Sequence, residues 1–423
     1  WGDHCYNVKS NYTSSAFRSY DVWYANYKWI ANVNYIIDAE PEMAGTEADV
    51  AYVAGQAYAI RALCYLNLAT WFSRAPYNSL TGASRWNEPC VPVYTTGTSI
   101  DTGGQPRDSL RTVYGRIDQD IDRAIELLEK ARETTLAENN KSHINLYVAL
   151  GIKSRACLAE GDWDGAFKAA KRVIDEGGYA VGTKSDLTGG MNSLDKQNVM
   201  WGAGIQVADQ AGGYAGFFTH MDNKEGAYAK SAPKLISKQL YNRISATDIR
   251  RDWWDPSDKE SPYVSKKFSF ANVASFLGDY IYMRVEEMYF TAAEAALRLD
   301  DLKSARELMN TVMAERDPGY SANNRSGTLL GATTTTWTGS FLENILTHRR
   351  IELWGEYGRL FDVRRLGQGI DRRTDDGFSE ECISMMNRRN VNITKADTYD
   401  WVLTIPKAEL DANPNINEED QNP

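Results

Sequence analysis

Acidic side chains occur in close pairs along the chain, and paired carboxyl groups are what a glycoside hydrolase uses. Such an enzyme needs two carboxyls about 5–10 Å apart across a sugar, one of them kept protonated by a raised pKa. Glu352 and Glu356 could meet this spacing on one helix, but the arginines of the same stretch, RRIELWGEYGRLFDVRRL, would hold both carboxylates ionised. We therefore expect no catalytic role for them, nor for the two other pairs, Glu286 with Glu287 and Asp375 with Asp376.

Other patterns for catalysis or metal binding are lacking in the sequence. The four histidines are not paired at a spacing of four residues, and the chain contains no G-x-S-x-G, H-E-x-x-H or Walker motif. The five cysteines are widely spaced and form neither a zinc pattern nor a disulfide framework. We predict no cofactor. The acidic segment from Asp371 to Glu380 leaves a structural calcium ion open as an alternative, although it lacks the EF-hand spacing.

Aromatic side chains in polar loops are better candidates for ligand binding. The chain has 24 Tyr and 12 Trp but only 12 Phe, and Tyr and Trp suit rings that meet water or a polar ligand. A sugar presents flat C–H faces that stack on such rings, while Arg, Asn and Asp bind its hydroxyl groups. We predict three contact regions, with packing of the loop on the core as the alternative for each: Tyr77, Arg85, Trp86 and Asn87; Tyr214 with Phe217 and Phe218; and Trp253, Trp254 and Tyr263 with Asp252.

Trp86 is the ring that we expect to matter most for binding. Its neighbours in SLTGASRWNEPC are polar, and no apolar partner stands at helical or strand spacing. Burying the ring would bury those neighbours too, and each would then need a hydrogen-bond partner. The pattern therefore predicts an exposed indole beside Arg85 and Asn87, outside the core.

The overall charge argues against two classes of partner. The net charge is −10, the pI is near 5.2, and no long basic tract offsets this balance. A nucleic-acid partner and an anionic membrane surface are therefore not expected. No run of eighteen apolar residues occurs, so no segment of the sequence spans a bilayer as a helix.

Helical periodicity dominates the chain, and strand patterns are scarce. We predict one domain over residues 1–423, built from helical hairpins and long loop-rich segments. The hairpins are expected at about 21–73, 107–177, 282–316 and 341–367, and the loop-rich segments at about 74–106, 178–278 and 318–340. Loops of such length in a compact protein are usually functional.

Two distant blocks of the sequence repeat each other. SRACLAEGDWDGAFKAAKRVI, from Ser154, aligns without gaps to AAEAALRLDDLKSARELMNTV, from Ala293. Each block is a helix, a short turn and a second helix with a small residue in its first turns. This arrangement is typical of tetratricopeptide repeats, in which the small residue lets two antiparallel helices approach closely. We therefore expect Ala166 and Ala305 to be buried at equivalent helix crossings.

Four stretches together resemble the SusD/RagB family of outer-membrane nutrient-binding lipoproteins from Bacteroidetes. The first is Asn34-Tyr35-Ile36-Ile37 followed by AYAIRALCYLNLATWFSRAPY, although SRAPY lacks the family's usual glycine. The second and third are LGIKSRACLAEGDWDGAFKAAKRVIDEGGYAV and YMRVEEMYFTAAEAALRLDDLKSARELMNTVMAER. The fourth combines RRIELWGEYGRLFDVRRL with the closing VLTIPKAELDANPNINEEDQNP. The four stretches follow the family's order over nearly the whole chain.

The resemblance implies an all-α fold, in which tetratricopeptide-like hairpins form a right-handed superhelical scaffold with an irregular, loop-rich ligand-binding face. It implies capture of a glycan at the cell surface and delivery to a SusC-like TonB-dependent transporter, without catalysis. It also implies a surface-exposed lipoprotein of the outer membrane, attached through an N-terminal lipid anchor that this chain lacks. Capture of a peptide, as in the RagB branch, remains an alternative, and an all-α glycoside hydrolase is a weaker one.

The charged stretch from Arg349 to Leu366 resembles a hallmark of the family, which points to a structural role. We interpret it as one helix whose charges join a partly buried ion-pair network, with a solvated helix face as the alternative. The predicted members of this network are Arg284, Glu287, Glu352, Glu356 and Arg359. We expect the carboxylate of Glu352 to lie within ion-pair distance of an arginine.

Overall fold

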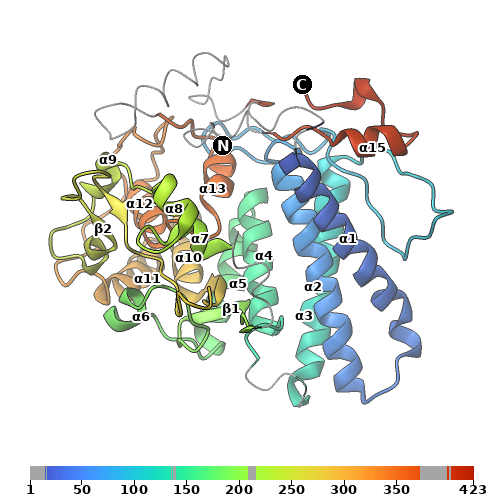
Figure 1. The fold of residues 1–423 in the computed structure, drawn as a ribbon, viewed down its shortest axis with the longest axis horizontal. Helices are drawn as coiled ribbons and strands as arrows, with labels where there is room; N and C mark the ends of the chain where they lie inside the picture. Colours follow the sequence, from blue (N-terminus) through green and yellow to red (C-terminus); the bar gives the residue numbers. More distant parts are fainter. Residues whose placement is uncertain are drawn as a thin grey trace.

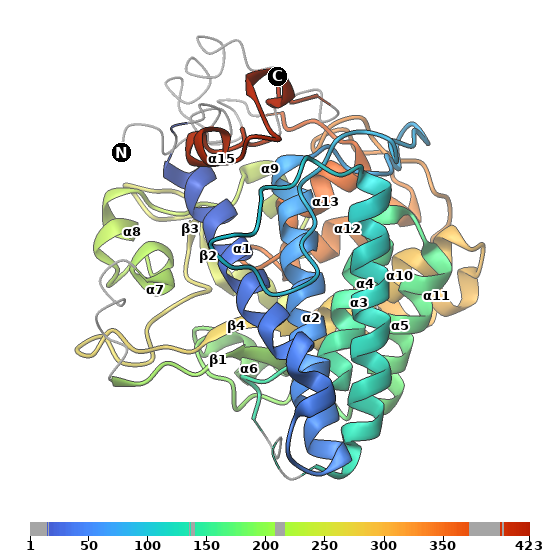
Figure 2. The same cartoon turned by 90° about the vertical axis from the view of Figure 1, so that its right-hand side faces the viewer.

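The structure is a computed structural model that describes residues 15, 17–134, 136, 140–207, 216–371, 398–399 and 402–423. The helices of residues 17–176 stand together on one side of the molecule, and most of the later helices lie with the irregular segments on the other (Figures 1 and 2). The longer helices are α1 Phe17–Ala39, α2 Glu47–Phe72, α3 Leu110–Lys130, α4 Leu146–Glu160, α5 Trp163–Glu176, α10 Val285–Arg298, α11 Leu302–Ala314 and α12 Phe341–Glu352.

The remaining elements are short. The α-helices are α6 Lys184–Thr188, α7 Phe217–Met221, α8 Ala227–Ser231, α9 Lys238–Tyr241, α13 Arg359–Leu366 and α15 Lys407–Ala412. The strands are β1 Val199–Ala203, β2 Trp254–Asp255, β3 Val264–Ser265 and β4 Tyr280–Arg284, and 3₁₀ turns cover 40–42, 131–133, 249–253 and 418–420. The expected all-α class, with few strands, is confirmed. Among the described residues, no helix is both long and apolar enough to cross a membrane.

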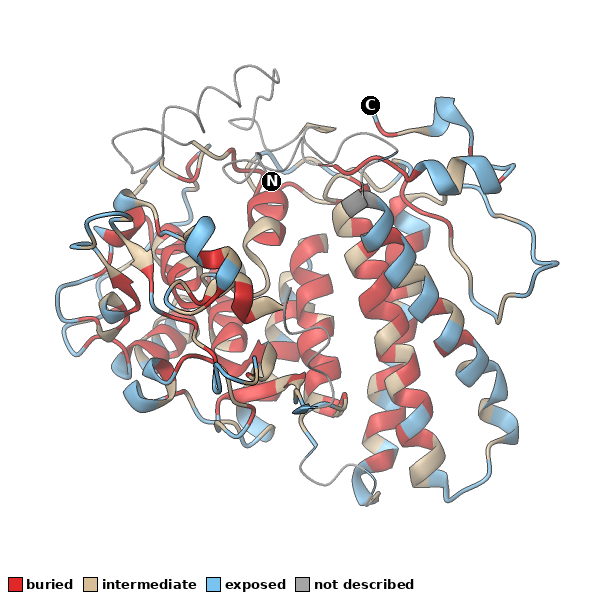
Figure 3. Ribbon diagram, viewed as in Figure 1, coloured by how far each residue is buried: buried red, intermediate tan, exposed pale blue. Residues whose placement is uncertain are grey.

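The first hairpin, α1 with α2, packs against α3 and forms the largest part of the core. Helix α2 begins at the cap Thr46, whose hydroxyl accepts a hydrogen bond from the Asp49 amide. Its alanine-rich sequence is buried along most of its length, because α1 covers one side and α3 the other. Helix α1, in contrast, keeps its outer face in solvent (Figure 3).

The two repeated sequence blocks form equivalent hairpins, α4 with α5 and α10 with α11. The aligned residues Asp162 and Asp301 cap the second helix of each hairpin, and each side chain accepts from the amide three residues later. Ala166 and Ala305 are both fully buried, as predicted. Helix α10 also packs on α5, so the two hairpins are neighbours in space although the sequence separates them.

The segment between these two hairpins leaves the helical side and returns to it through one short β ladder. Strands β1 and β4 pair antiparallel, with Ala203 opposite Tyr280 and Trp201 opposite Met283. Beyond the ladder, the irregular residues enclose a second hydrophobic core built largely from aromatic rings. The ladder therefore fixes where the loop-rich side joins the helical side.

The stretch from Arg349 to Leu366 is not the single helix that its periodicity predicts. Helix α12 ends at Glu352, a turn follows, and α13 begins at Arg359. Gly355 has φ +75° and Gly358 has φ +118°, which are left-handed conformations that side chains rarely adopt. The two glycines therefore permit the turn that separates the helices.

Candidate functional site

A groove of about 540 Å³ opens where the first hairpin faces the loop-rich side, and we call it the central groove. Its walls come from α1 and α2, from α4, from the β1–β4 ladder, and from the turn between α12 and α13. The lining residues are Trp29, Leu63, Asn67, Arg155, Met191, Trp201, Phe217, Phe268, Tyr280, Ile281, Tyr282, Gly355, Glu356 and Tyr357. The groove is thus assembled from segments that are far apart in the sequence.

Aromatic rings make up half of this lining, and two of them are exposed to solvent. Trp29 is 57% exposed and Tyr282 is 40% exposed, whereas Phe268 is buried. The rings of Trp201 and Tyr282 meet edge to face, with centroids 5.0 Å apart. Exposed aromatic rings at a concave site are typical of ligand-binding grooves.

The polar groups of the central groove are few and held in place. The Arg155 guanidinium lies 3.9 Å from the centroid of the Tyr357 ring and forms a two-point ion pair with Glu287. Glu356 accepts from Arg284 Nε at 2.8 Å and pairs with Lys267. Fixed polar groups beside flat apolar rings suit a ligand that has both hydroxyl groups and apolar faces.

A buried ion-pair network adjoins the central groove, and we call it the Glu352 cluster. The Glu352 carboxylate lies 3.0 Å from Arg284, 3.0 Å from Arg316 and 3.1 Å from Arg250. The charged side chains of all its members are at most 8% exposed. The cluster balances four cations with four carboxylates, which are Arg250, Lys267, Arg284 and Arg316 with Asp248, Glu286, Glu352 and Glu356.

The predicted pairing of Glu352 with an arginine is confirmed, but two predicted members of the network are wrong. Glu286 joins the cluster instead of Glu287, because consecutive residues on α10 point in different directions. Glu287 pairs instead with Arg155 and Arg349. Arg359 is half-buried at the start of α13, and the carboxylate that acts on it is Asp362 rather than Glu352 or Glu356.

The cations set the protonation state of the two central carboxylates. Burial favours a raised pKa for Glu352, but Arg316, Arg284 and Arg250 outweigh it and hold the pKa well below its ordinary value. Burial acts in the same direction on Glu356, and Arg284 and Lys267 again lower its pKa. Both carboxylates are therefore ionised at neutral pH, and neither has the raised pKa of a general acid.

Trp253 and Trp254 do not offer their rings to a ligand, contrary to the prediction. They are 2% and 1% exposed and belong to the second hydrophobic core. The indole of Trp253 donates to the Leu187 carbonyl at 2.8 Å, and Lys267 Nζ lies 4.4 Å from its ring centroid. Tyr263 is half-buried and packs edge-on against Tyr241. These rings form a core because the long loop folds back on itself and brings its own apolar partners.

The loop around Trp86 lies apart from the central groove. The Trp86 ring is half-buried and meets the Tyr114 ring edge to face, with centroids 5.7 Å apart, so an apolar partner exists that the sequence does not reveal. Arg85 and Tyr77 are also half-buried, and Asn87 is exposed. None of the four lines the central groove, and their role in binding stays a prediction.

Two other predictions fall on residues that the structure leaves out. Tyr214 lies outside the described residues, although Phe217 from the same set does line the central groove, and Phe218 is buried. The acidic segment considered for calcium lies outside them as well, apart from Asp371, so a calcium ion there stays a prediction.

The principal rings of the central groove, which are Trp29, Trp201 and Tyr282, are not among those that the sequence predicts. A signal for Trp29 exists, because a tryptophan on the outer side of an amphipathic helix is out of place. Trp201 and Tyr282 carry no such signal, since only the β1–β4 ladder brings them together.

Comparisons with known proteins agree with this fold. A family profile described as the SusD family matches residues 223–423, and one described as starch-binding associating with outer membrane matches residues 3–158. No curated protein sequence matches the chain.

Three solved structures illustrate the likeness. A SusD-like carbohydrate binding protein from Bacteroides vulgatus is 28% identical, with a TM-score of 0.67, over 83% of this chain and 71% of that chain. A SusD superfamily protein from Bacteroides thetaiotaomicron is 22% identical, with a TM-score of 0.74, over 95% and 85%. Surface glycan-binding protein A from Bacteroides uniformis is 17% identical, with a TM-score of 0.66, over 99% and 88%. The latter two likenesses show the fold alone. The two family profiles match both halves of the chain, and they show that this chain belongs to the SusD/RagB family.

Proposed function

We propose that the protein captures a glycan at the surface of the outer membrane, holds it in the central groove and delivers it to a SusC-like TonB-dependent transporter. The observation that carries this proposal is the ring-lined central groove, with Trp29 and Tyr282 exposed and Arg155 and Glu356 fixed beside them. The printed descriptions of the similar proteins, which name starch, carbohydrate and glycan binding, support the same ligand class.

Charge favours a neutral glycan over a strongly charged ligand. Arg155 and Glu356 are the charged side chains that line the central groove in the described part of the chain. Arg155 is neutralised by Glu287, and Glu356 is neutralised by Arg284 and Lys267. Neither has an unpaired charge to offer an anionic or cationic ligand. Binding then rests on ring stacking and on hydrogen bonds to hydroxyl groups.

The proposed role is binding without hydrolysis. Glu356 is the one carboxylate among the described residues that line the central groove, and its pKa is lowered by Arg284 and Lys267. A hydrolase needs a second carboxyl across the sugar and an acid with a raised pKa. This reading predicts that a bound oligosaccharide is recovered intact after long incubation, as chromatography of the mixture would show.

A glycan array with the purified protein, followed by calorimetry on the oligosaccharide that binds, tests the ligand class. Trp29→Ala should lose about 1–3 kcal/mol of binding free energy, since truncating an aromatic anchor commonly does so. Tyr35→Ala is the matched control, because Tyr35 is equally exposed on the same helix at 55% but lies outside the central groove. Equal affinities of wild type and Trp29→Ala for the oligosaccharide would contradict the assignment of the central groove as the glycan-binding site. Binding of peptides and of no glycan would favour the RagB-like alternative.

Delivery to a transporter is tested separately in cells. A tagged protein should co-purify from outer membranes with a TonB-dependent transporter, and proteinase added to intact cells should degrade it. Recovery from the periplasm without a membrane partner would contradict this part of the proposal.

A further inference from the structure

A second groove lies on the other flank of α1, and we call it the side groove. Helix α1 is the element whose rings are most exposed, with Tyr20 at 41%, Tyr24 at 50% and Trp29 at 57%. At about 100° per residue, Trp29 points away from the row formed by Tyr20, Tyr24 and Tyr27. The helix therefore presents one ring to the central groove and a row of rings to the side groove.

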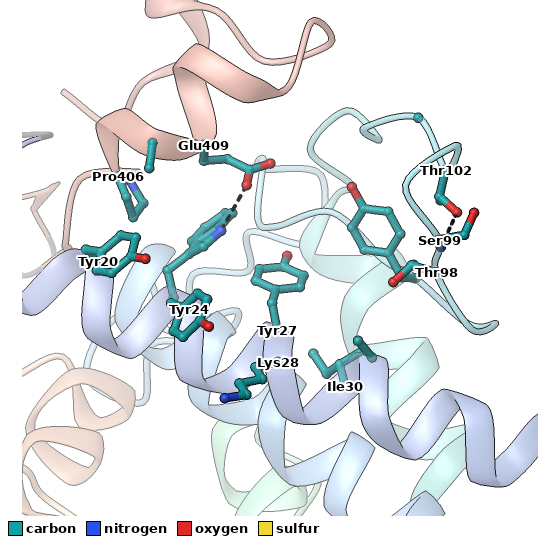
Figure 4. A pocket seen from close by; sticks show the side chains of 15 residues that line it. Tyr20, Tyr24, Tyr27, Lys28, Ile30, Thr98, Ser99, Thr102, Pro406 and Glu409 are labelled. Atoms are coloured by element: carbon teal, nitrogen blue, oxygen red, sulfur yellow. Dashed lines mark hydrogen bonds between the residues drawn. The ribbon is translucent and has the colours of Figure 1, made fainter.

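The side groove has a volume of about 540 Å³ and is bounded by α1, the loop of residues 94–103 and the start of α15 (Figure 4). Tyr20 and Tyr24 lie nearly parallel on its α1 side, with centroids 5.4 Å apart and an interplanar angle of 12°. Trp23, Tyr27 and Tyr94 also line the groove, and these inner rings are all less exposed than Tyr20 and Tyr24. The exposed rings thus continue inward into rings that are held by the core.

Hydrogen bonds fix the inner rings in place. The hydroxyl of Tyr27 donates to the Pro92 carbonyl at 2.7 Å, and the hydroxyl of Tyr94 accepts from the Gln105 amide at 2.9 Å. The Trp23 indole donates to Glu409 Oε2 at 3.2 Å. A site whose rings are already held in place loses less conformational freedom when it binds a ligand.

Polar groups that can bind hydroxyls stand around these rings. Glu409 is held by Trp23 on one oxygen and by Asn413 on the other, and a carboxylate retains further lone pairs for donors. Lys28 lies in the lining, with its Nζ 5.8 Å from the centroid of the Tyr24 ring. Thr98, Ser99 and Thr102 add hydroxyl groups on the loop side (Figure 4).

We propose that the side groove is a second glycan-binding site, distinct from the central groove. The inference rests on the proposed function, because it assigns the same ligand class to a second place. Stacked tyrosines with a carboxylate, an amine and hydroxyls at the edge match a sugar ring, which has apolar faces and hydroxyl edges. An apolar protein partner would leave Glu409 and Lys28 desolvated without partners of opposite charge.

Two sites on opposite flanks of one helix would act together on a long chain. A polysaccharide that reaches both grooves makes its second contact at a high effective concentration, so its affinity exceeds that of a short oligosaccharide. The side groove would then favour polymers over fragments that fill the central groove alone.

The test uses the shortest oligosaccharide that binds on a glycan array and a longer polymer of the same unit. In a Trp29→Ala/Tyr282→Ala background, which removes rings from the central groove, weak binding of the oligosaccharide should persist. Adding Tyr20→Ala and Tyr24→Ala should reduce this residual affinity about 5- to 150-fold, the range expected for losing an aromatic anchor. Tyr24→Phe keeps the ring and should retain most of the affinity. Thermal unfolding should be unchanged by the Tyr20 and Tyr24 changes, because both rings lie outside the core.

In the otherwise wild-type protein, Tyr20→Ala/Tyr24→Ala should weaken polymer binding at least about tenfold while leaving oligosaccharide binding in the central groove intact. No residual binding in the Trp29→Ala/Tyr282→Ala background, or unchanged polymer affinity in the tyrosine variant, would overturn the second site while leaving the central groove standing. No effect of Trp29→Ala on the oligosaccharide would instead contradict the central groove, and a wild-type protein that binds no glycan would overturn both.

Discussion

The Glu352 cluster and the central groove adjoin each other, but they differ in charge and in exposure to solvent. In the cluster, eight charged groups balance one another and almost no surface reaches water. In the groove, charges are few and already paired, while large rings remain exposed. Under the proposed function, dense charge therefore belongs to the scaffold of this protein, and exposed aromatic rings belong to the ligand site.

Glu356 connects the two regions. Its carboxylate belongs to the Glu352 cluster, while it and its neighbours Gly355 and Tyr357 line the central groove. The cluster thereby anchors the turn between α12 and α13 that forms one wall of the groove. A buried network of this kind is better suited to fixing the relative position of elements than to adding stability.

Removing Glu352 should give the largest effect on stability. Glu352→Ala leaves Arg250, Arg284 and Arg316 without their shared carboxylate, so the free energy of unfolding should fall by about 3–5 kcal/mol. Denaturant unfolding of the variant and wild type measures the loss. An unchanged denaturant midpoint would mean that the cluster does not stabilise the fold. The cluster could then no longer be assigned to the scaffold in contrast to the groove.

Changing Glu356 should affect both regions at once, and by less. Glu356→Gln keeps the shape of the side chain but weakens charged hydrogen bonds to Arg284 and Lys267, each worth about 1.5–3 kcal/mol. We expect a moderate loss of stability together with weaker glycan binding, because the turn that carries Tyr357 is less firmly held. Calorimetric affinity and unfolding are measured on the same preparation, with Tyr35→Ala as the control. Lost stability with full affinity would show that the cluster does not position the groove.

The same contrast explains what could be predicted from the sequence. The hairpins were predictable because periodicity and caps are local, and Asp162 and Asp301 begin their helices at aligned positions. That Glu352 pairs with an arginine was predictable. That Glu286 rather than Glu287 belongs to the cluster was not, because this depends on the direction in which each residue of α10 points. The groove was not predictable, because Trp201 and Tyr282 meet only through a short ladder between distant segments.

Trp86 tests whether a half-buried ring outside the two grooves also binds the ligand. Its edge-on contact with Tyr114 and its half-buried position favour a packing role. Trp86→Ala should therefore lower the free energy of unfolding by about 1–2 kcal/mol, roughly half of what a fully buried Trp loses, and leave glycan affinity intact. Reduced affinity at unchanged stability would instead support the binding role that the sequence predicts for Trp86, and would extend the ligand site to that loop.

The last expected effect depends on pH and lies at the end of α4, where the environment of a carboxylate is the reverse of that in the Glu352 cluster. Burial raises the pKa of Glu160 to about 9, and the nearby carboxylates Asp118 and Asp162 add to this rise, while Lys153 opposes it. Burial likewise raises the pKa of Asp118 to about 6. One oxygen of Glu160 is buried without a hydrogen-bond partner. Here no arginine cluster compensates for burial, so the neutral form is favoured.

The sign of the pH dependence follows from this raised pKa. Because the pKa of Glu160 is higher in the folded protein than its ordinary value of 4.5, the group binds its proton more tightly when folded. Its contribution to stability is complete below about pH 4.5 and is lost as the pH rises through about 9. Glu160→Gln stays neutral throughout, so its midpoint of thermal unfolding should match wild type near about pH 4.5 and exceed it by a few degrees near about pH 9. Equal midpoints at both values would show that Glu160 is ionised in the folded protein. In that case burial without cations would not suffice to keep a carboxyl neutral in this fold, and the three arginines around Glu352 would have little effect of burial to outweigh.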